Sequence, residues 1–443
     1  MAARTVGSPT VLVVPPPTIW TQAQSGIAAL NSGAGYTALM AGDLGQIIRL
    51  GRQALGLDQA ELGRLSNASQ TVVSRAERGM NTDSVVLANL CKALGLLTNQ
   101  PGEHDPAYSE DMRRRDLLRN VAAAVAAGML PSQISEPAHA GRIGISEIED
   151  CWAALRRLQA MEDRQGGGTV YQLTAGIAEH LQQTVGRASY DSSTGNKLRE
   201  VTAIAAVRAG WQAFDSSRRD SARRWWLEAR SLADLGGGAD EARVMALAAM
   251  AVPAREAGRG HEAIGLARAA RQAAGQTAHP KLVSLLAARE AIGHAKVGDT
   301  AASVHCMSEA RRLLDQGADG NAPAWLSFWG EGDLAVHEMH CAKATSNFAA
   351  AERAARDAAQ ASSPHRGLRN HSIYSAYLGN VLALRGQFDE SISITEYVLT
   401  AGALAGSQRV ASEVRKTATV LAKTDYRPAR ELVAQVERLV SAA

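Results

Sequence analysis

The stretch "GLDQAELGRLSNASQTVVSRAERG", residues 56–79, carries the signals of two short helices joined by a tight turn. Asp58 followed three residues later by Glu61 is a capping box, in which each side chain accepts a hydrogen bond from the backbone of the other, so a helix should begin here. Asn67 tolerates the positive φ of a tight turn, and Ser69 can cap the helix that follows. The stretch therefore predicts a helix, a turn and a second helix.

Residues on either side extend this pattern. Asp43 and Gln46 form a second possible capping box at the start of a preceding helix. Gly56 is expected to end that helix, and Gly79 to end the helix after the turn in a left-handed conformation. The residues of this last helix that are expected to face inward are Val72, Val73 and Ala76.

This arrangement resembles the XRE family of DNA-binding domains, the helix-turn-helix class of the lambdoid repressors. The likeness is carried by Arg52, "GLDQAEL" at 56–62, Ser69, "VSRAERG" at 73–79 and "LCKALGL" at 90–96. It implies a five-helix fold that places one helix in the major groove of double-stranded DNA. Asn67 stands where the family usually has glycine, and Asp83 stands where a proline often begins the last turn. Asp83 would bring a negative charge close to the surface expected to face phosphate.

The resemblance implies roles for individual side chains. Gln59 matches the family's phosphate-binding glutamine, and Arg52 with Glu77 matches a partly buried ion pair that fixes the first helix against the third. Arg75 is suited to guanine and Gln70 to adenine, because each can form paired hydrogen bonds with that base. The expected DNA contacts are Gln59, Ser69, Gln70, Thr71, Ser74, Arg75 and Arg78.

The rest of the chain contains a repeat of about 40 residues, marked by small or modest side chains in three sets of equal phase. The central set is Ala222, Ala263, Ser303, Ala344 and Ser391; seven residues later come Ala229, Ala270, Ala310, Ala351 and Val398; twelve residues before the central set come Gly210, Ala251, Ala291, Gly332 and Gly379. Small side chains at fixed points let two helices approach closely and let the next pair stack on them. The shared phase favours a helical solenoid over a generic helical bundle.

The repeat resembles the tetratricopeptide repeat, although its period is longer than the usual length of about 34 residues and the fourth unit, around 323–360, is degraded. The joined architecture resembles actinobacterial regulators that combine a repressor-type domain with a carboxy-terminal tetratricopeptide-like array. It is also similar to peptide-sensing regulators of Gram-positive bacteria, in which the array binds a signalling peptide and resets the dimer. The resemblance implies that the array senses a ligand.

The repeat phase also predicts a ligand groove along the first helices of the units. The residues expected to line it are Trp211, Phe214, Arg255, Trp329, Asp333, His337 and Asn380. Apolar shelves with a few polar anchors suit a peptide or a small molecule, with Arg255 able to hold a carboxylate and Asn380 a peptide backbone amide. The alternative for each residue taken alone is core packing, which is the commoner role of tryptophans in repeat arrays.

Composition limits the other classes of function. The 443 residues, with 4% aromatic side chains and abundant alanine and leucine, predict an all-α protein of two or three domains. The net charge of +3 is small, so any DNA contact must come from a local patch. The four cysteines are far apart, and "HEMHC" at 337–341 misses the spacing of zinc proteases, so we expect no disulfide, metal or other cofactor. No nucleophile, base and orienting acid can be placed together, so we expect no enzyme.

Export and membrane insertion are not expected either. The apolar run before the triple proline near the N-terminus is too short for a signal peptide. The segment "MRRRDLLRNVAAAVAAGML", residues 112–130, contains Arg119 and Asn120 and is shorter than the roughly 20 residues that a bilayer span needs. We interpret it as a connector helix in a cytoplasmic protein that makes no membrane contact, with an internal secretion signal as the alternative.

These observations predict four segments. They are a disordered or extended segment (1–34), a five-helix DNA-binding domain (35–96), a linker with the connector helix (97–145) and an α-solenoid for sensing and dimerisation (146–443). The predicted function is a homodimeric, sequence-specific transcription regulator that binds a DNA operator and senses a peptide or small molecule. The alternative is a protein-interaction scaffold built on the array, without specific DNA binding.

Overall fold

The computed structural model is helical in the part of the chain that it describes. The described residues are 34–35, 38, 43–80, 83–94, 96, 143–165, 167–235, 240–317, 321–362, 364–400 and 408–441. No strand occurs in these ranges, so the all-α prediction is confirmed. Within them, no helix has both the length and the apolar character needed to cross a lipid bilayer. The predicted segments 1–34 and 97–145 lie almost entirely outside the described residues.

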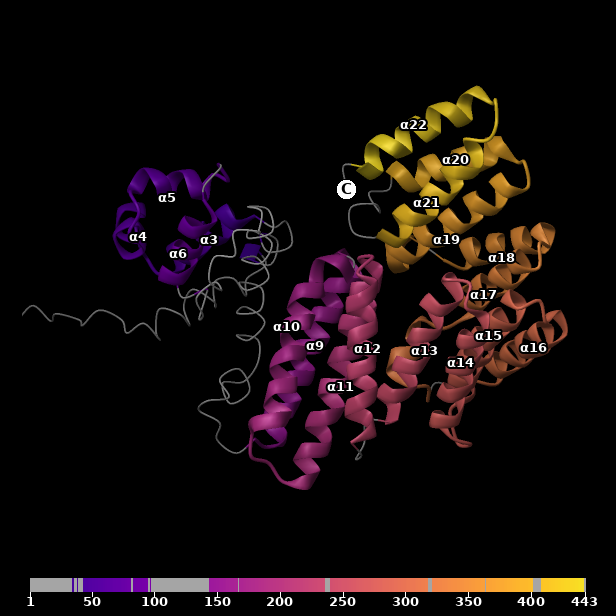
Figure 1. Ribbon diagram of the computed structural model, residues 1–443, viewed down its shortest axis with the longest axis horizontal. Helices are drawn as coiled ribbons and strands as arrows, with labels where there is room; N and C mark the ends of the chain where they lie inside the picture. Colours follow the sequence, from indigo (N-terminus) through magenta and orange to yellow (C-terminus); the bar gives the residue numbers. More distant parts are fainter. Residues whose placement is uncertain are drawn as a thin grey trace, which may run out of the picture. The chain divides into compact units, whose positions relative to one another are not determined.

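The chain divides into two compact units, residues 1–129 and 130–443. The described helices of the first unit are α3 (Leu44–Ala54), α4 (Gln59–Ser66), α5 (Gln70–Glu77) and α6 (Ser84–Ala93) (Figure 1). Helix α4 packs against α5 and α6, and α3 packs against α5. The fully buried side chains among them include Ile47, Ile48, Leu62, Val73 and Leu90. The fifth helix of the predicted fold is not among the elements that the structure describes.

Local hydrogen bonds begin and end these helices at the residues that the sequence indicates. The backbone N–H of Glu61 donates to Asp58 Oδ1 and that of Asp58 donates to Glu61 Oε2, each over 2.7 Å, which completes the capping box. Asn67 has a φ of 55°, and Ser69 Oγ accepts from the backbone N–H of Val72 at 3.3 Å. The two glycine helix ends at positions 56 and 79 both have a φ of 66°. The helix, the turn and the second helix are therefore formed as predicted.

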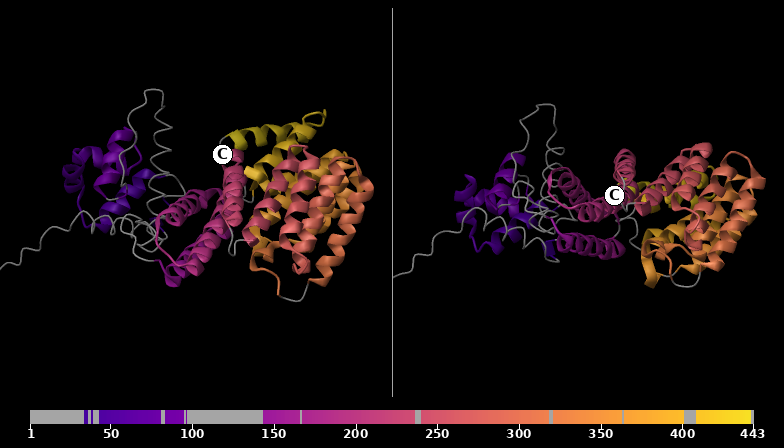
Figure 2. Two further views of the ribbon diagram at one scale, coloured as in Figure 1. Left: turned by 60° about the horizontal axis from the view of Figure 1, so that its bottom comes forward. Right: turned by 90° about the horizontal axis from the view of Figure 1, so that it is seen from below.

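The second unit consists of helical pairs that follow one another along the chain. It begins with α9 (Ile145–Gln165) and α10 (Gly167–Arg187) and ends with α21 (Gln408–Leu421) and α22 (Arg427–Ser441). Between them lie five pairs: α11 (Ser192–Asp215) with α12 (Arg219–Asp234), α13 (Asp240–Glu256) with α14 (Gly260–Ala274), α15 (Pro280–Lys296) with α16 (Thr300–Gln316), α17 (Glu331–Ala344) with α18 (Phe348–Ala361), and α19 (Pro364–Leu384) with α20 (Phe388–Thr400). The helices of each pair are in extensive contact, and successive pairs stack in chain order (Figure 2).

The same three-residue turn joins the two helices in all five pairs. The middle residue of each turn has a positive φ, between 59° and 83°, and these residues are Ser217, Gly258, Gly298, Ser346 and Gly386. A left-handed residue at a fixed point of every unit is a structural repeat in its own right, and glycine fills it in three of the five turns because glycine adopts this conformation without steric cost. The turns therefore set the phase of the repeat independently of the small side chains.

The sequence positions predicted for the small residues of the repeat are correct in four of the five helical pairs and wrong in the fourth pair. In the other units the central small residue is the fourth residue of the second helix, as Ala222 is in α12. The fourth residue of α18 is Ala351, which is fully buried, whereas Ala344 is the last residue of α17 and is half-buried. The extra residues lie before α17, where the chain forms a short 3-10 helix, η2 (Ala324–Phe328).

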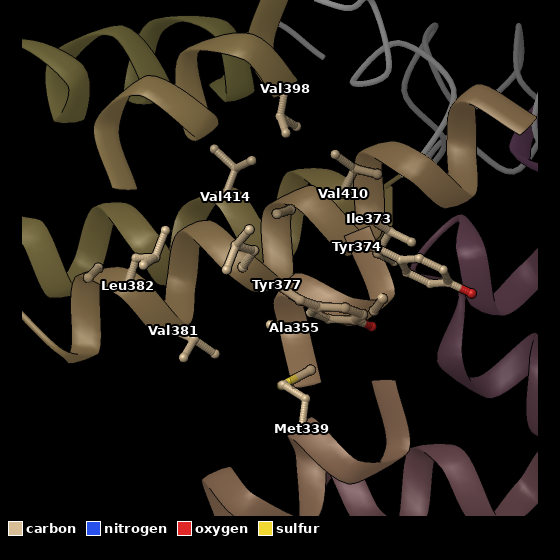
Figure 3. Packing of buried hydrophobic residues seen from close by; sticks show 14 of the residues in the cluster. Met339, Ala355, Ile373, Tyr374, Tyr377, Val381, Leu382, Val398, Val410 and Val414 are labelled. Atoms are coloured by element: carbon tan, nitrogen blue, oxygen red, sulfur yellow. The ribbon is translucent and has the colours of Figure 1, made fainter. Parts of the chain in front are cut away.

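Close contact between paired helices depends on the small side chains. A Cβ added to Gly210 in α11 would lie 2.5 Å from Cδ1 of Trp226 in α12, so only glycine lets this buried indole ring pack there. The ring nitrogen donates to the carbonyl of Val207 at 3.3 Å. Nearer the C-terminus, α17 to α22 share one apolar cluster, in which Met339 and Val414 lie at opposite sides (Figure 3).

Candidate functional site

One face of α5 is polar and exposed, and the opposite face is buried. Val73 and Ala76 lie in the core, while Val72, which was expected to face inward, is only half-buried. The exposed side chains among the predicted DNA contacts are Ser69, Gln70, Thr71, Arg75 and Arg78. Ser74 and Gln59 are half-buried. Five of the seven predicted contacts are thus fully available to a partner.

Two glycines bring backbone against backbone around α5. A Cβ on Gly45 in α3 would lie 2.6 Å from the carbonyl oxygen of Ala76, and a Cβ on Gly63 in α4 would lie 2.6 Å from that of Ala68. Real Cβ atoms do not approach backbone oxygens so closely, because the atoms would overlap. Close main-chain contact therefore helps to position α5 against α3, and the turn before α5 against α4.

Arg52 and Glu77 join the first and third of these helices, as the resemblance implies. Arg52 Nε lies 2.5 Å from Glu77 Oε1, and Arg52 Nη1 donates to the carbonyl of Leu57 at 2.7 Å. The Glu77 side chain is 5% exposed. Gln59 Nε2 donates to Glu77 Oε2 at 2.8 Å, which leaves one of its two amide hydrogens for another acceptor. A single buried carboxylate therefore orients both the structural arginine and the glutamine expected to bind phosphate.

Two further hydrogen bonds hold charged side chains at or near the exposed face of α5. Arg78 Nε donates to the carbonyl of Ser74 at 3.1 Å, which holds its guanidinium along α5. Asp83 Oδ1 accepts from the backbone N–H of Val85 at 2.7 Å and caps α6. The negative charge that departs from the family pattern is thereby stabilised at a helix N-terminus.

A second group of polar side chains lies inside the second unit, and every member comes from a first helix or from α21. This inner polar cluster consists of Arg255 (α13), Arg289 (α15), Asp333, His337 and His340 (α17), Tyr374 and Tyr377 (α19) and Arg409 (α21). Figure 3 shows the hydroxyl groups of Tyr374 and Tyr377 at the edge of the apolar cluster, directed away from Val381 and Val414. Helix α19 therefore contributes side chains both to the apolar cluster and to the inner polar cluster.

The predicted ligand residues are divided between this cluster and the core. Arg255, Asp333 and His337 belong to the cluster, and Phe214 is buried beside it. Trp211 is half-buried and meets the Phe214 ring edge-on at 5.9 Å.

Two of the predicted ligand residues are already occupied by other contacts. Trp329 is 1% exposed, belongs to an apolar core cluster and donates from Nε1 to Ser284 Oγ at 3.1 Å, so it is a core residue and forms no ligand shelf. Asn380 is 3% exposed and its Oδ1 accepts from Lys343 Nζ at 2.6 Å, so Lys343 already uses one of the two acceptor positions of this buried oxygen.

Sequence reasoning missed His340 because the fourth repeat was out of phase, whereas the other missed members, Arg289, Tyr374, Tyr377 and Arg409, lie outside that repeat. With α18 in register, the residues of α17 equivalent to Trp211 and Phe214 are His340 and Lys343. Arg289 was missed for another reason, since it lies one turn nearer the start of its helix than the positions that were projected. A signal was present, because Arg289 and Glu290 are the charged residues in the otherwise apolar centre of α15.

Burial dominates the electrostatics of the cluster. Burial, together with the charge of Arg255, lowers the pKa of Arg289 to about 9. Burial raises the pKa of Asp333 to about 6, although Tyr374 donates a hydrogen bond to its carboxylate. Burial and Arg255 together lower the pKa of His337 and that of His340 well below the usual range, so both imidazoles are neutral at pH 7. The permanent charges are therefore carried mainly by the arginines.

A cavity of about 430 Å³ adjoins the cluster. Its walls come from helices far apart in the sequence and include Phe214, Pro253, Glu256, Tyr377 and Arg409. Arg409 Nη1 lies 3.4 Å from Asp215 Oδ1, so α21 contacts the end of α11 across the cavity wall. The volume is within the range of small-molecule sites.

A group of possible metal ligands elsewhere in this unit is an ion-pair network. One atom each of Glu290, His294 and Cys306 lie within 4.8 Å of one another. The Glu290 carboxylate, however, lies 2.6 Å from Arg268 Nε and 3.4 Å from Arg271 Nη1. Two guanidinium charges already balance this carboxylate and repel a cation, so these residues do not suit a metal ion.

No protein-family model matches the chain, and no curated protein matches it.

Proposed function

We propose that this protein is a dimeric, sequence-specific DNA-binding transcription regulator whose second unit senses a ligand. The observation that carries the proposal is the rigid α4–turn–α5 unit. Its turn is set by Asn67 at positive φ, its second helix is capped by Ser69, and its polar face presents Gln70 and Arg75 to solvent. The second unit is proposed to be a tetratricopeptide-like solenoid.

The chemistry of the α5 face suits base recognition. An arginine forms paired hydrogen bonds with guanine, a glutamine does so with adenine, and each such pair contributes about 1–3 kcal/mol of discrimination. A small helix-turn-helix module covers few base pairs, so related domains bind as dimers to half-sites about 34 Å apart. We therefore propose that two copies of the chain bind one operator.

The proposed sensing role rests on the second unit. Its cavity is walled by both apolar and charged side chains, and it lies beside polar groups from successive first helices. Sites of this kind bind small molecules or short peptides, because apolar walls supply affinity and a few polar groups supply orientation.

A gel-shift assay on genomic DNA fragments tests the DNA-binding part. Arg75→Ala and Gln70→Ala should each weaken binding to a selected operator by roughly 5- to 150-fold, which is 1–3 kcal/mol. Lys92→Ala is the matched control, because Lys92 is an exposed cation of the same unit on α6, which packs chiefly against α4. Its effect should stay within about threefold.

The outcome also separates the two candidate functions. Salt-sensitive binding that depends on Arg75 supports a regulator, and sedimentation of the complex should give two chains per operator. If no fragment is bound specifically, or if Lys92→Ala weakens binding as much as Arg75→Ala, α5 does not read bases. The protein-interaction scaffold would then be the better explanation.

A further inference from the structure

Two arginines inside the second unit are buried and form no ion pair with any carboxylate in the described part of the chain. The exposed fractions are 8% for Arg255 and 7% for Arg289. Arg255 Nη1 and Arg289 Nε have no hydrogen-bond partner in the described part of the chain. The guanidinium carbon of Arg289 lies 5.8 Å from the centre of the Trp211 ring.

The neighbouring charges do not compensate for these two cations. Arg255 and Arg289 repel each other, and each lowers the pKa of His337, which keeps that imidazole neutral. Asp333 attracts Arg289 but already accepts a hydrogen bond from Tyr374. Glu256 attracts Arg255, but its carboxylate is paired with Arg219 at 2.9 Å. The buried carboxylate of Asp215 is paired with Arg409. The cluster therefore holds more positive than negative charge.

Buried charges are normally paired, because burial removes hydration that only an opposite charge can replace. Two guanidinium groups with unused N–H donors supply what a carboxylate or phosphate binds, namely several directed hydrogen bonds with opposite charge. We propose that Arg255 and Arg289 bind an anionic group, a carboxylate or a phosphate, of the ligand that the second unit senses. This inference rests on the proposed sensing function and names the chemistry of its ligand.

The adjoining cavity offers space for the rest of such a ligand. Arg255 and Arg289 do not line the cavity themselves, but Tyr377, Glu256 and Arg409 do, and all three act electrostatically on Arg255, so the cavity lies next to Arg255. Phe214 and Pro253 provide apolar wall on the opposite helices. The site therefore suits a small molecule with one anionic end and one apolar part.

Calorimetric titration of the 443-residue chain in chloride buffer tests the proposal with two probes, inorganic phosphate and glutarate. Glutaramide, the neutral analogue of glutarate, and added sodium chloride serve as ligand controls. The wild type should bind at least one anion saturably, and Arg255→Met and Arg289→Met should each weaken that binding at least tenfold. Arg353→Met, which removes an exposed arginine of α18, should leave it unchanged. The anion that binds shows whether the natural ligand carries a carboxylate or a phosphate.

A third variant keeps the test informative if a methionine variant fails to fold. Asp333→Asn keeps both arginines and removes a negative charge next to Arg289, so it should tighten anion binding severalfold. The proposal is overturned if neither anion binds, if glutaramide or sodium chloride has the same effect, or if Asp333→Asn weakens binding.

Gel shifts on the same preparations separate this inference from the proposed function. Loss of anion binding with Arg75-dependent DNA binding intact contradicts the anion site alone. Anion binding without any specific DNA binding contradicts the regulator and leaves the anion site standing.

Discussion

Replacing Arg289 with methionine should make the protein more stable when no anion is present. The pKa of Arg289 falls from its ordinary value of 12.5 to about 9, because burial and the charge of Arg255 disfavour its protonated form. One pKa unit corresponds to about 1.4 kcal/mol, so keeping this side chain charged at pH 7 costs the folded state about 5 kcal/mol. Arg289→Met removes that cost.

Two losses reduce the gain. The contact between the guanidinium and the Trp211 ring contributes about 1 kcal/mol. Asp333 also loses an attracting charge, and this carboxylate is already disfavoured by burial, which we estimate as a further loss of about 1 kcal/mol. The net expectation is a rise in the free energy of unfolding of about 2–3 kcal/mol, in line with other replacements of buried charges by apolar residues.

Urea unfolding followed by circular dichroism at pH 7, in chloride buffer free of phosphate and carboxylates, measures this difference. Arg353→Met is the matched control and should change the free energy of unfolding by less than about 0.5 kcal/mol. If Arg289→Met has no effect or destabilises the protein, Arg289 is satisfied in the folded state and the reasoning fails.

Three further substitutions test the packing, the pH dependence and the buried ion pair. Gly210→Ala should lower the free energy of unfolding by roughly 1–3 kcal/mol, because the added methyl group overlaps a buried indole ring. Gly265→Ala, in open space on α14, is the control and should raise the free energy of unfolding by roughly 0.5–1 kcal/mol, as measured like the first by thermal unfolding. Asp333 holds its proton in the folded protein up to pH 6, whereas in the unfolded chain it loses it near pH 4. Its contribution to the free energy of unfolding is therefore present below pH 4 and falls by about 3 kcal/mol as the pH rises to 6. Urea unfolding of wild type and of Asp333→Asn across this pH range should show a difference in the free energy of unfolding that changes in the same way. A difference that stays constant with pH would contradict the prediction. Glu77→Ala leaves the guanidinium of Arg52 without its carboxylate and should destabilise the first unit by roughly 3–5 kcal/mol. The expected result is faster amide hydrogen exchange in α3 and α5, and unchanged exchange would show that the ion pair is dispensable for stability.

The local structure of the first unit could be predicted well because its signals are short-range. The capping box of Asp58 and Glu61, the left-handed Asn67 and the Ser69 cap each involve residues no more than three apart, so the sequence itself contains both partners. The hydrogen bond from Gln59 to Glu77 could not be predicted in the same way, because it depends on how two helices pack.

The fourth repeat shows where small side chains stop being informative. Helix α18 carries alanine at several successive positions, so more than one register satisfies the same pattern, and the insertion before α17 cannot be located from it. The turn residues would have resolved the ambiguity, since Ser346 stands where three of the other units have glycine. The unpaired state of Arg255 and Arg289 is a property of the folded interior, and no sequence pattern contains it.

The contact between Asp215 and Arg409 joins residues 194 positions apart in the chain. In an open solenoid each repeat touches only its neighbours, so the array can fray from either end without disturbing its middle. Here α21, which follows the fifth pair, forms an ion pair with the end of α11, a helix of the first of the five pairs. We therefore expect the first and fifth pairs to be coupled in unfolding more strongly than they would be in an open array.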